Sequence, residues 1–159
     1  MKNLVVYYSR TGNTKKVAEE ISKIIKADID EVSENKNRKG IIGWLGAGKD
    51  AMSKKETKIS FKINPDKYDL ILIGTPIWGF TVVPAIRTYL LHNKDKLKKV
   101  AFFSTSGGSP IDKVAIEMEK ISKKPIATLG LTTSSKIDLS KDNNLEKIKA
   151  FCEKIKSNK

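Results

Sequence analysis

The sequence predicts an α/β fold in which a five-stranded parallel sheet lies between two layers of helices. Short apolar runs alternate along the chain with segments whose apolar residues recur at helical spacing. Strands separated by helices pair in parallel through right-handed crossovers, so this alternation leads to a three-layer sandwich. The chain has 159 residues, and neither an internal repeat nor a shift in composition marks a boundary. We therefore expect one domain over residues 1–159.

The strands are predicted where the apolar runs occur. Residues 4–8 are five consecutive apolar residues, which is typical of a strand buried on both faces. The other predicted strands cover residues 28–32, 70–74, 100–104 and 126–131. Helices are predicted at residues 13–26 and 84–92, after Ser109 and Pro110, and at the C-terminus. Ser109 would be the N-cap of the third helix and Pro110 its first residue.

Residues 33–62 interrupt the alternation and are expected to be irregular. Within them, residues 43–49 match the G-x-x-x-x-G-K part of a nucleotide-binding loop. Asp50 stands where the motif needs Ser or Thr, and no strand precedes it, so we reject that interpretation. We expect instead that the segment covers the sheet or a partner with its apolar residues, which are Ile41, Ile42, Trp44 and Leu45.

The composition restricts the classes of function. The net charge is +13, which suits acidic partners, nucleic acid or an anionic surface. The lysines are scattered, however, and neither an RNA-binding aromatic motif nor zinc-ligand spacing accompanies them, so binding of nucleic acid is disfavoured. No Cys/His cluster predicts a metal, and the single histidine, His92, leaves no basis for assigning catalytic residues.

The expected location is the cytoplasm. No apolar run is long enough to span a bilayer, and the N-terminus lacks the pattern of a signal peptide, so membrane insertion is not expected. Cys152 is the only cysteine, which excludes an internal disulfide. It falls on the apolar side of the predicted last helix, where we expect a buried, inert thiol.

A polar turn follows the first predicted strand and leads into the first helix. It consists of Ser9, Arg10, Thr11, Gly12, Asn13 and Thr14. A helix N-terminus carries unpaired backbone N–H groups and a partial positive charge, so the turn is a candidate anion site. Lys15 and Lys16 would be unfavourable there by about 0.3–1 kcal/mol each unless an anion is bound. The alternative is an ordinary strand-to-helix turn with Asn or Thr as N-cap.

Two further polar loops follow the third and fourth predicted strands, at residues 75–83 and 105–109. Ligands bind at the carboxyl ends of strands in sheets of this kind. Trp78 in the first of these loops could stack on a planar ligand or could cap the core. Gly107 and Gly108 in the second would let the backbone approach a ligand closely, or they could simply form a turn.

The chain resembles the flavodoxin family. Residues 9–14, Ser-Arg-Thr-Gly-Asn-Thr, are similar to that family's phosphate loop, [ST]-x-T-G-N-T, and residues 68–79 are similar to its third strand and first flavin-flanking loop. The resemblance implies strand order 2-1-3-4-5 and FMN as cofactor. It implies that Ser9, Thr11, Asn13 and Thr14, with the N–H groups of Arg10 and Gly12, bind the phosphate. Pro76, Ile77, Trp78 and Gly79 would line the isoalloxazine, and Thr105, Ser106, Gly107 and Gly108 would hold its pyrimidine edge.

The resemblance implies an electron-transfer carrier between redox proteins, which the basic surface suggests are acidic. Two departures from the family pattern favour alternatives. Residues 105–109 contain no aromatic residue, which would leave the flavin open to a substrate. A flavodoxin-like NAD(P)H-dependent FMN reductase acting on a quinone or another small acceptor is therefore the second hypothesis. The net charge of +13, where the family is commonly acidic, supports a third, a basic binding module on the same fold.

Overall fold

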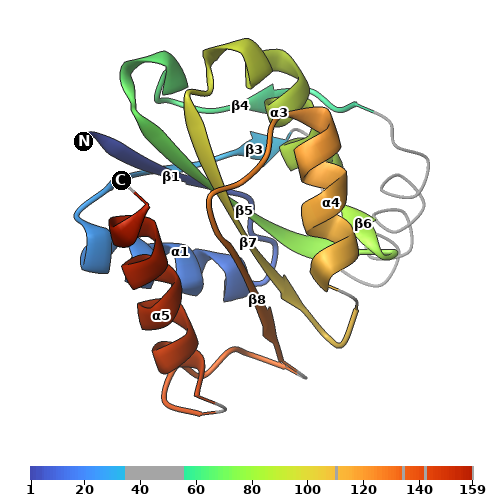
Figure 1. Ribbon diagram of the computed structural model, residues 1–159. Helices are drawn as coiled ribbons and strands as arrows, with labels where there is room; N and C mark the ends of the chain where they lie inside the picture. Colours follow the sequence, from blue (N-terminus) through green and yellow to red (C-terminus); the bar gives the residue numbers. More distant parts are fainter. Residues whose placement is uncertain (35–55, 110, 134, 142, 159) are drawn as a thin grey trace.

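Five parallel strands form the centre of the computed structural model, as the alternation predicts (Figure 1). The structure describes residues 1–34, 56–109, 111–133, 135–141 and 143–158. The strands are β1 (Asn3–Tyr7), β2 (Asp28–Glu31), β5 (Leu70–Trp78), β7 (Lys99–Ser106) and β8 (Thr128–Thr132). Their order in the sheet is β2-β1-β5-β7-β8. Counted along the chain, this is the expected order 2-1-3-4-5.

Helices cover both faces of the sheet (Figure 1). Helices α1 (Asn13–Ile25) and α5 (Asn144–Ser157) pack on one face, together with Leu72 and Phe103 of the sheet. Helices α3 (Pro84–Asn93) and α4 (Ile111–Ile121) pack on the other. Two short 3-10 helices, Pro65–Lys67 and Lys94–Lys96, lie before β5 and after α3. The predicted three-layer sandwich is confirmed.

The two loops predicted at residues 75–83 and 105–109 are partly wrong, because the strands before them continue. Strand β5 extends to Trp78 and then turns back as β6 (Thr81–Val82), which pairs with it in antiparallel register. Strand β7 extends to Ser106. The extended ends of β5 and β7 pair with each other through Thr75 and Ser104. Thr, Ile, Val and Trp favour strands once a neighbour is available to pair, and the sequence alone does not reveal that neighbour.

The expectation that residues 33–62 are irregular is wrong at both ends of the segment. Strand β3 (Ser33–Glu34) pairs with β4 (Ile59–Ser60) in an antiparallel ladder. The buried carboxylate of Asp30 accepts hydrogen bonds of 2.7 Å from the backbone N–H groups of Lys62 and Ile63. The nucleotide-loop-like stretch at residues 43–49 lies outside the described residues, as do Ile41, Ile42, Trp44 and Leu45.

Cys152 is buried in α5, as predicted. Its side chain is part of the apolar layer between α5 and the sheet. Burial raises the pKa of this thiol to about 11, so the thiol is protonated at neutral pH. A protonated, buried thiol is a packing residue rather than a nucleophile.

Gly74 allows β5 to pack against β7. A Cβ atom at this position would lie 2.1 Å from the Cζ atom of Phe103, a ring that is fully buried. We expect Gly74→Ala to lower the free energy of unfolding by about 1–3 kcal/mol through overpacking, measured by urea unfolding. Gly107→Ala is the matched control, because its Cβ would meet its nearest atom at 3.8 Å. Equal stability of both variants would contradict this packing argument.

Candidate functional site

The three predicted site segments meet at the carboxyl ends of β1, β5 and β7. The hydroxyls of Thr14 and Thr105 share a buried hydrogen bond of 2.8 Å, although 91 residues separate them. The ring of Trp78 packs edge-on against Tyr8, which follows β1, with 5.6 Å between the ring centroids. The guanidinium of Arg10 lies 5.3 Å from the centroid of the Trp78 ring. The first segment thus contacts both of the others.

The turn before α1 leaves the helix N-terminus without a side-chain cap. Gly12 is the N-cap, with φ of +91°, and no side chain accepts a hydrogen bond from the first turn. The alternative of a turn capped by Asn or Thr is therefore wrong. The first turn contains no acidic residue, and Lys15 and Lys16 follow in it. The first N–H groups of a helix have no acceptor within the helix, so these groups and the partial positive charge of α1 suit an anion.

Ser9 supports the same interpretation from inside the turn. Its Oγ atom is buried and has no hydrogen-bond partner among the described residues. A buried hydroxyl left unsatisfied costs about 1–3 kcal/mol, so such groups are usually paired in native proteins. An anion oxygen seated at the turn would supply the missing partner. The residues present at this turn therefore fit a phosphate group.

The remaining residues of the turn differ in what they contact. Arg10 is half-buried beside Trp78, whereas Thr11 and Gly12 are exposed. Asn13 bonds to the chain beyond β8: its Nδ2 donates to Ser135 O at 2.8 Å, and its Oδ1 accepts from Ile137 N at 2.9 Å. Lys16 Nζ also donates, at 3.2 Å, to Ile137 O. The side chain of Asn13 thus ties the turn to the segment after β8.

Sequence reasoning did not find the role of Ser135 and Ile137. They contribute through backbone groups, which any residue carries, and they lie more than 120 residues from Asn13. The available signal was their position, because they follow the carboxyl end of the last strand, at the same edge of the sheet as the other segments.

The second segment forms the tip of β5 and a tight turn. Ile77 is buried in the core beneath α3 and α4, Pro76 and Trp78 are half-buried, and Gly79 is exposed. Trp78 also packs against this core, so its two predicted roles, capping the core and facing a ligand, are compatible. Gly79 and Phe80 have φ of +55° and +63°. Positive φ at both central residues is the requirement of a type I′ hairpin turn.

The third segment changes from buried strand to open turn. Thr105 and Ser106 are buried in β7, whereas Gly107 and Gly108 are exposed. The Ser106 hydroxyl accepts from Gly108 N and donates to Ser109 O, both at 3.3 Å. Added Cβ atoms at Gly12 and Gly108 would meet nothing within 4 Å. Open space therefore lies beside two of the three segments.

Helix α4 begins at Ile111, and the predicted helix start at Pro110 lies outside the described residues.

A largely buried ion pair, Arg87 with Glu117, lies against the β5–β6 hairpin. Glu117 of α4 accepts hydrogen bonds from the Thr81 hydroxyl, from Val82 N at 3.1 Å, and from the guanidinium of Arg87. Burial raises the pKa of Glu117, but these hydrogen bonds and the charge of Arg87 outweigh it and hold the pKa below its ordinary value. The pair fixes β6 to α3 and α4. Sequence spacing gave no signal for it.

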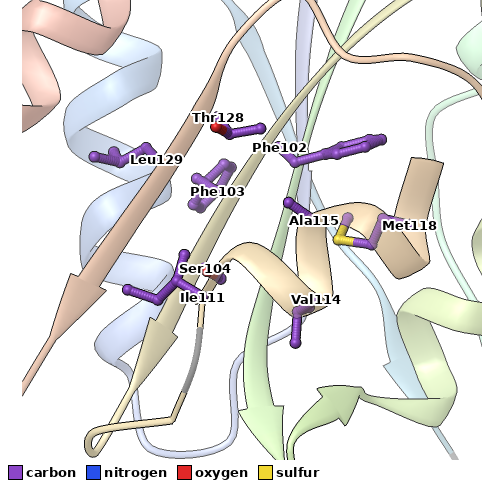
Figure 2. A pocket seen from close by; sticks show the side chains of 9 residues that line it. All are labelled: Phe102, Phe103, Ser104, Ile111, Val114, Ala115, Met118, Thr128 and Leu129. Atoms are coloured by element: carbon purple, nitrogen blue, oxygen red, sulfur yellow. The ribbon is translucent and has the colours of Figure 1, made fainter.

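A small cavity lies close to the third segment, between β7, β8 and α4 (Figure 2). Its volume is about 10 Å³, and its lining is mostly apolar, with Phe102, Val114 and Met118 among the side chains. A cavity of this size holds at most one water molecule, and an apolar one stays dry. We interpret it as a packing defect rather than a ligand site.

The described part of the chain offers no other obvious chemistry. It contains no group of three or more His, Cys, Asp or Glu residues that could hold a metal ion. None of its helices has the length and apolar character that crossing a membrane requires.

Solved structures of other proteins have the same fold as this chain. A flavoprotein from Lactobacillus acidophilus, solved in complex with FMN, is 29% identical, with a TM-score of 0.71 over 81% of this chain and 92% of its own. The NMR structure of the apo-form of the L. acidophilus flavoprotein is 28% identical, with a TM-score of 0.63 over 81% and 91%. Oxidised flavodoxin 1 from Bacillus cereus, at 19% identity, shares the fold, with a TM-score of 0.58 over 99% and 98%.

The family assignment rests on a match over most of the sequence. No protein with curated annotation matches the chain significantly. The model of the flavodoxin family, however, matches residues 2–131. With the strand order of the sheet, this match shows that the chain belongs to the flavodoxin family.

Proposed function

We propose that this protein binds FMN and carries electrons between redox proteins. The observation that carries the proposal is the buried, unpartnered hydroxyl of Ser9 beside the uncapped N-terminus of α1. The same edge of the sheet presents Trp78 and the open turn at Gly107 and Gly108. The FMN bound by the L. acidophilus relative supports the choice of cofactor.

Each segment has a distinct role in this proposal. The phosphate is held by Ser9, by the exposed Thr11 and by the N–H groups of the first turn of α1. The isoalloxazine lies against residues 76–79, and residues 105–108 hold its pyrimidine edge through backbone groups. FMN supplies the redox chemistry when bound. The chain anchors the phosphate and positions the ring between residues 76–79 and 105–108.

Ser9→Ala has opposite consequences for folding and for binding. Because Ser9 Oγ has no partner among the described residues, we expect its removal to leave the stability of the apoprotein unchanged or slightly higher. Affinity for FMN should fall about tenfold, which corresponds to one lost hydrogen bond to a charged group. Thermal unfolding of the apoprotein and fluorescence titration with FMN measure the two effects. A loss of apoprotein stability together with unchanged FMN affinity would contradict the proposed role.

A potentiometric titration tests whether the protein is a carrier. A carrier between one-electron proteins should take up its two electrons in separate steps. Each step should have a slope of about 59 mV per tenfold change in the ratio of oxidised to reduced flavin. A single step with about half that slope would indicate two-electron chemistry and would count against the carrier.

The proposed partners are acidic redox proteins. The proposed location is the cytoplasm, which suits a single unpaired cysteine.

One observation favours the NAD(P)H-dependent FMN reductase as the second candidate. Gly107 and Gly108 are exposed and carry no side chain that could shield the ring from a small substrate. Anaerobic mixing of the FMN-loaded protein with NADH or NADPH separates the two functions. Rapid loss of flavin absorbance followed by its return on addition of a quinone would support the reductase. Stable absorbance would exclude it.

A further inference from the structure

An open groove lies beside the proposed flavin site, between the β5–β6 hairpin and α4. Gly79, Phe80 and Thr81 line one side, and Lys113, Ile116, Glu117 and Lys120 line the other. Its volume is about 440 Å³. Figure 1 shows β6 and α4 next to each other at this edge of the molecule. We call it the hairpin–α4 groove.

The groove contains an unusual concentration of exposed apolar surface. Phe80 is 58% exposed and Ile116 is 54% exposed. Among the described residues the other exposed large apolar side chains are Met1, at 50%, and Ile29, at 38%, and neither lines the groove. Phe80 is held outward although its φ of +63° is strained for an aromatic residue. Exposed apolar side chains that line one groove, with polar residues beside them, favour an interaction site.

The charged residues that line the groove are two exposed lysines and one glutamate. Lys113 and Lys120 are exposed on α4, on either side of Ile116 in the sequence. Glu117 does not balance them, because its carboxylate is paired with the buried Arg87 and bonded to Thr81 and Val82. These internal bonds also occupy the polar groups that a small ligand would need. An apolar centre with a charged rim matches the anatomy of a protein interface instead.

We propose that the hairpin–α4 groove docks an acidic electron-transfer protein, whose apolar patch covers Phe80 and Ile116 and whose carboxylates face Lys113 and Lys120. This inference rests on the proposed carrier function. Gly79 belongs both to the groove and to the segment proposed to line the flavin, so docking here brings the partner to the edge of the cofactor. One electron then passes from the reduced partner, which is oxidised, to FMN, which is reduced.

Charge reversal tests the cationic rim. The probe is a plant-type [2Fe–2S] ferredoxin of net negative charge, reduced and mixed with the FMN-loaded protein in a stopped-flow instrument. We expect Lys113→Glu/Lys120→Glu to lower the second-order rate constant at least about tenfold at low ionic strength and to abolish its decrease with salt. The matched control is Lys147→Glu/Lys154→Glu, because both lysines are exposed on α5, which packs on the other face of the sheet. This control should retain most of the rate.

Phe80→Asn tests the apolar centre. Asn tolerates positive φ, so this change removes the ring while keeping the turn. We expect the dissociation constant for the ferredoxin to rise about tenfold, as for a residue at the centre of an interface. The affinity for FMN, measured separately, should not change. An unchanged dissociation constant would overturn the apolar part of the proposal.

The outcomes distinguish a failure of the docking proposal from a failure of the proposed carrier function. Failure to retain FMN would be visible in the flavin spectrum before mixing and would overturn the cofactor. Amide shifts of the ¹⁵N-labelled protein on addition of ferredoxin map docking even if no electron passes. Shifts at Phe80, Lys113 and Ile116 support the groove. A DNA duplex is added in a parallel titration as an acidic probe that is not a redox protein. The proposal would be overturned by absent shifts with ferredoxin or by shifts that only the DNA duplex causes. Equal rate losses in the two double variants would also overturn it.

Discussion

We expect Gly12→Asp to lower the affinity for FMN about 100-fold, which corresponds to about 2.7 kcal/mol. Gly12 is the N-cap of α1, and an added Cβ atom would meet nothing within 4 Å. The new carboxylate would therefore occupy the place proposed for the phosphate and repel it. Two unit charges 4 Å apart near a protein surface interact by about 4 kcal/mol, so a 100-fold loss is within the range of the effect. Fluorescence titration of the apoprotein measures it.

Gly12→Asn is the matched control. Asn and Asp have the same shape, and the φ of +91° strains both to a similar extent, so the two apoproteins should lose similar amounts of stability relative to the parent protein. They differ in charge alone. Riboflavin, which lacks the phosphate, should bind both variants equally. A similar FMN affinity in the Asp and Asn variants would place the phosphate elsewhere.

We expect Glu117→Ala to lower the free energy of unfolding by about 3 kcal/mol or more. The change leaves the guanidinium of Arg87, whose side chain is 8% exposed, without its counter-charge. It also leaves Thr81 and Val82 N without their acceptor. Urea unfolding of the apoprotein measures the loss. The double variant Arg87→Met/Glu117→Leu should recover the part of the loss that comes from the unpaired guanidinium, whereas Thr81 and Val82 N still lack their acceptor.

The same pair predicts a pH dependence. The pKa of Glu117 is lower in the folded protein than in the unfolded chain, so its contribution to stability is complete above the unfolded value, near 4.5. It is lost as the pH falls through the lower, folded value. The double variant should therefore lose less stability than the parent protein as the pH is lowered below about 4.5. Parallel pH profiles would show that Glu117 does not contribute in this way.

Much of the fold can be predicted from the sequence because the spacing of apolar residues indicates which faces of the strands and helices are buried. The runs at residues 4–8 and 70–74 are buried on both faces, and α1 buries the apolar stripe of Val17, Ala18 and Ile21. The ends of β5 and β7 could not be predicted in the same way. Pro76 and Ser106 favour loops by local preference. Both lie in strands because the end of β5 pairs with β7 and the end of β7 pairs with β8. Pairing between distant segments overrides local preference.

In the candidate site, too, local motifs can be predicted from the sequence, whereas contacts between distant segments cannot. Residues 9–14 carry a recognisable local motif, and the structure brings Thr14 to Thr105 as the edge of the sheet requires. The contacts of Asn13 with residues 135 and 137, and the pair of Arg87 with Glu117, join segments far apart in sequence. They depend on the packing of whole elements, which residue spacing does not encode. The roles of Pro76, Ile77 and Gly79 toward the ring stay predictions.

The most direct test of phosphate anchoring at residues 9–14 is a comparison of two flavins. The apoprotein is titrated with FMN and with riboflavin under the same conditions, and flavin fluorescence gives both dissociation constants. We expect FMN to bind at least about 100-fold more tightly, since each charge-assisted hydrogen bond to the phosphate contributes about 1.5–3 kcal/mol. Equal affinity for the two flavins, or no binding of FMN, would contradict the proposal.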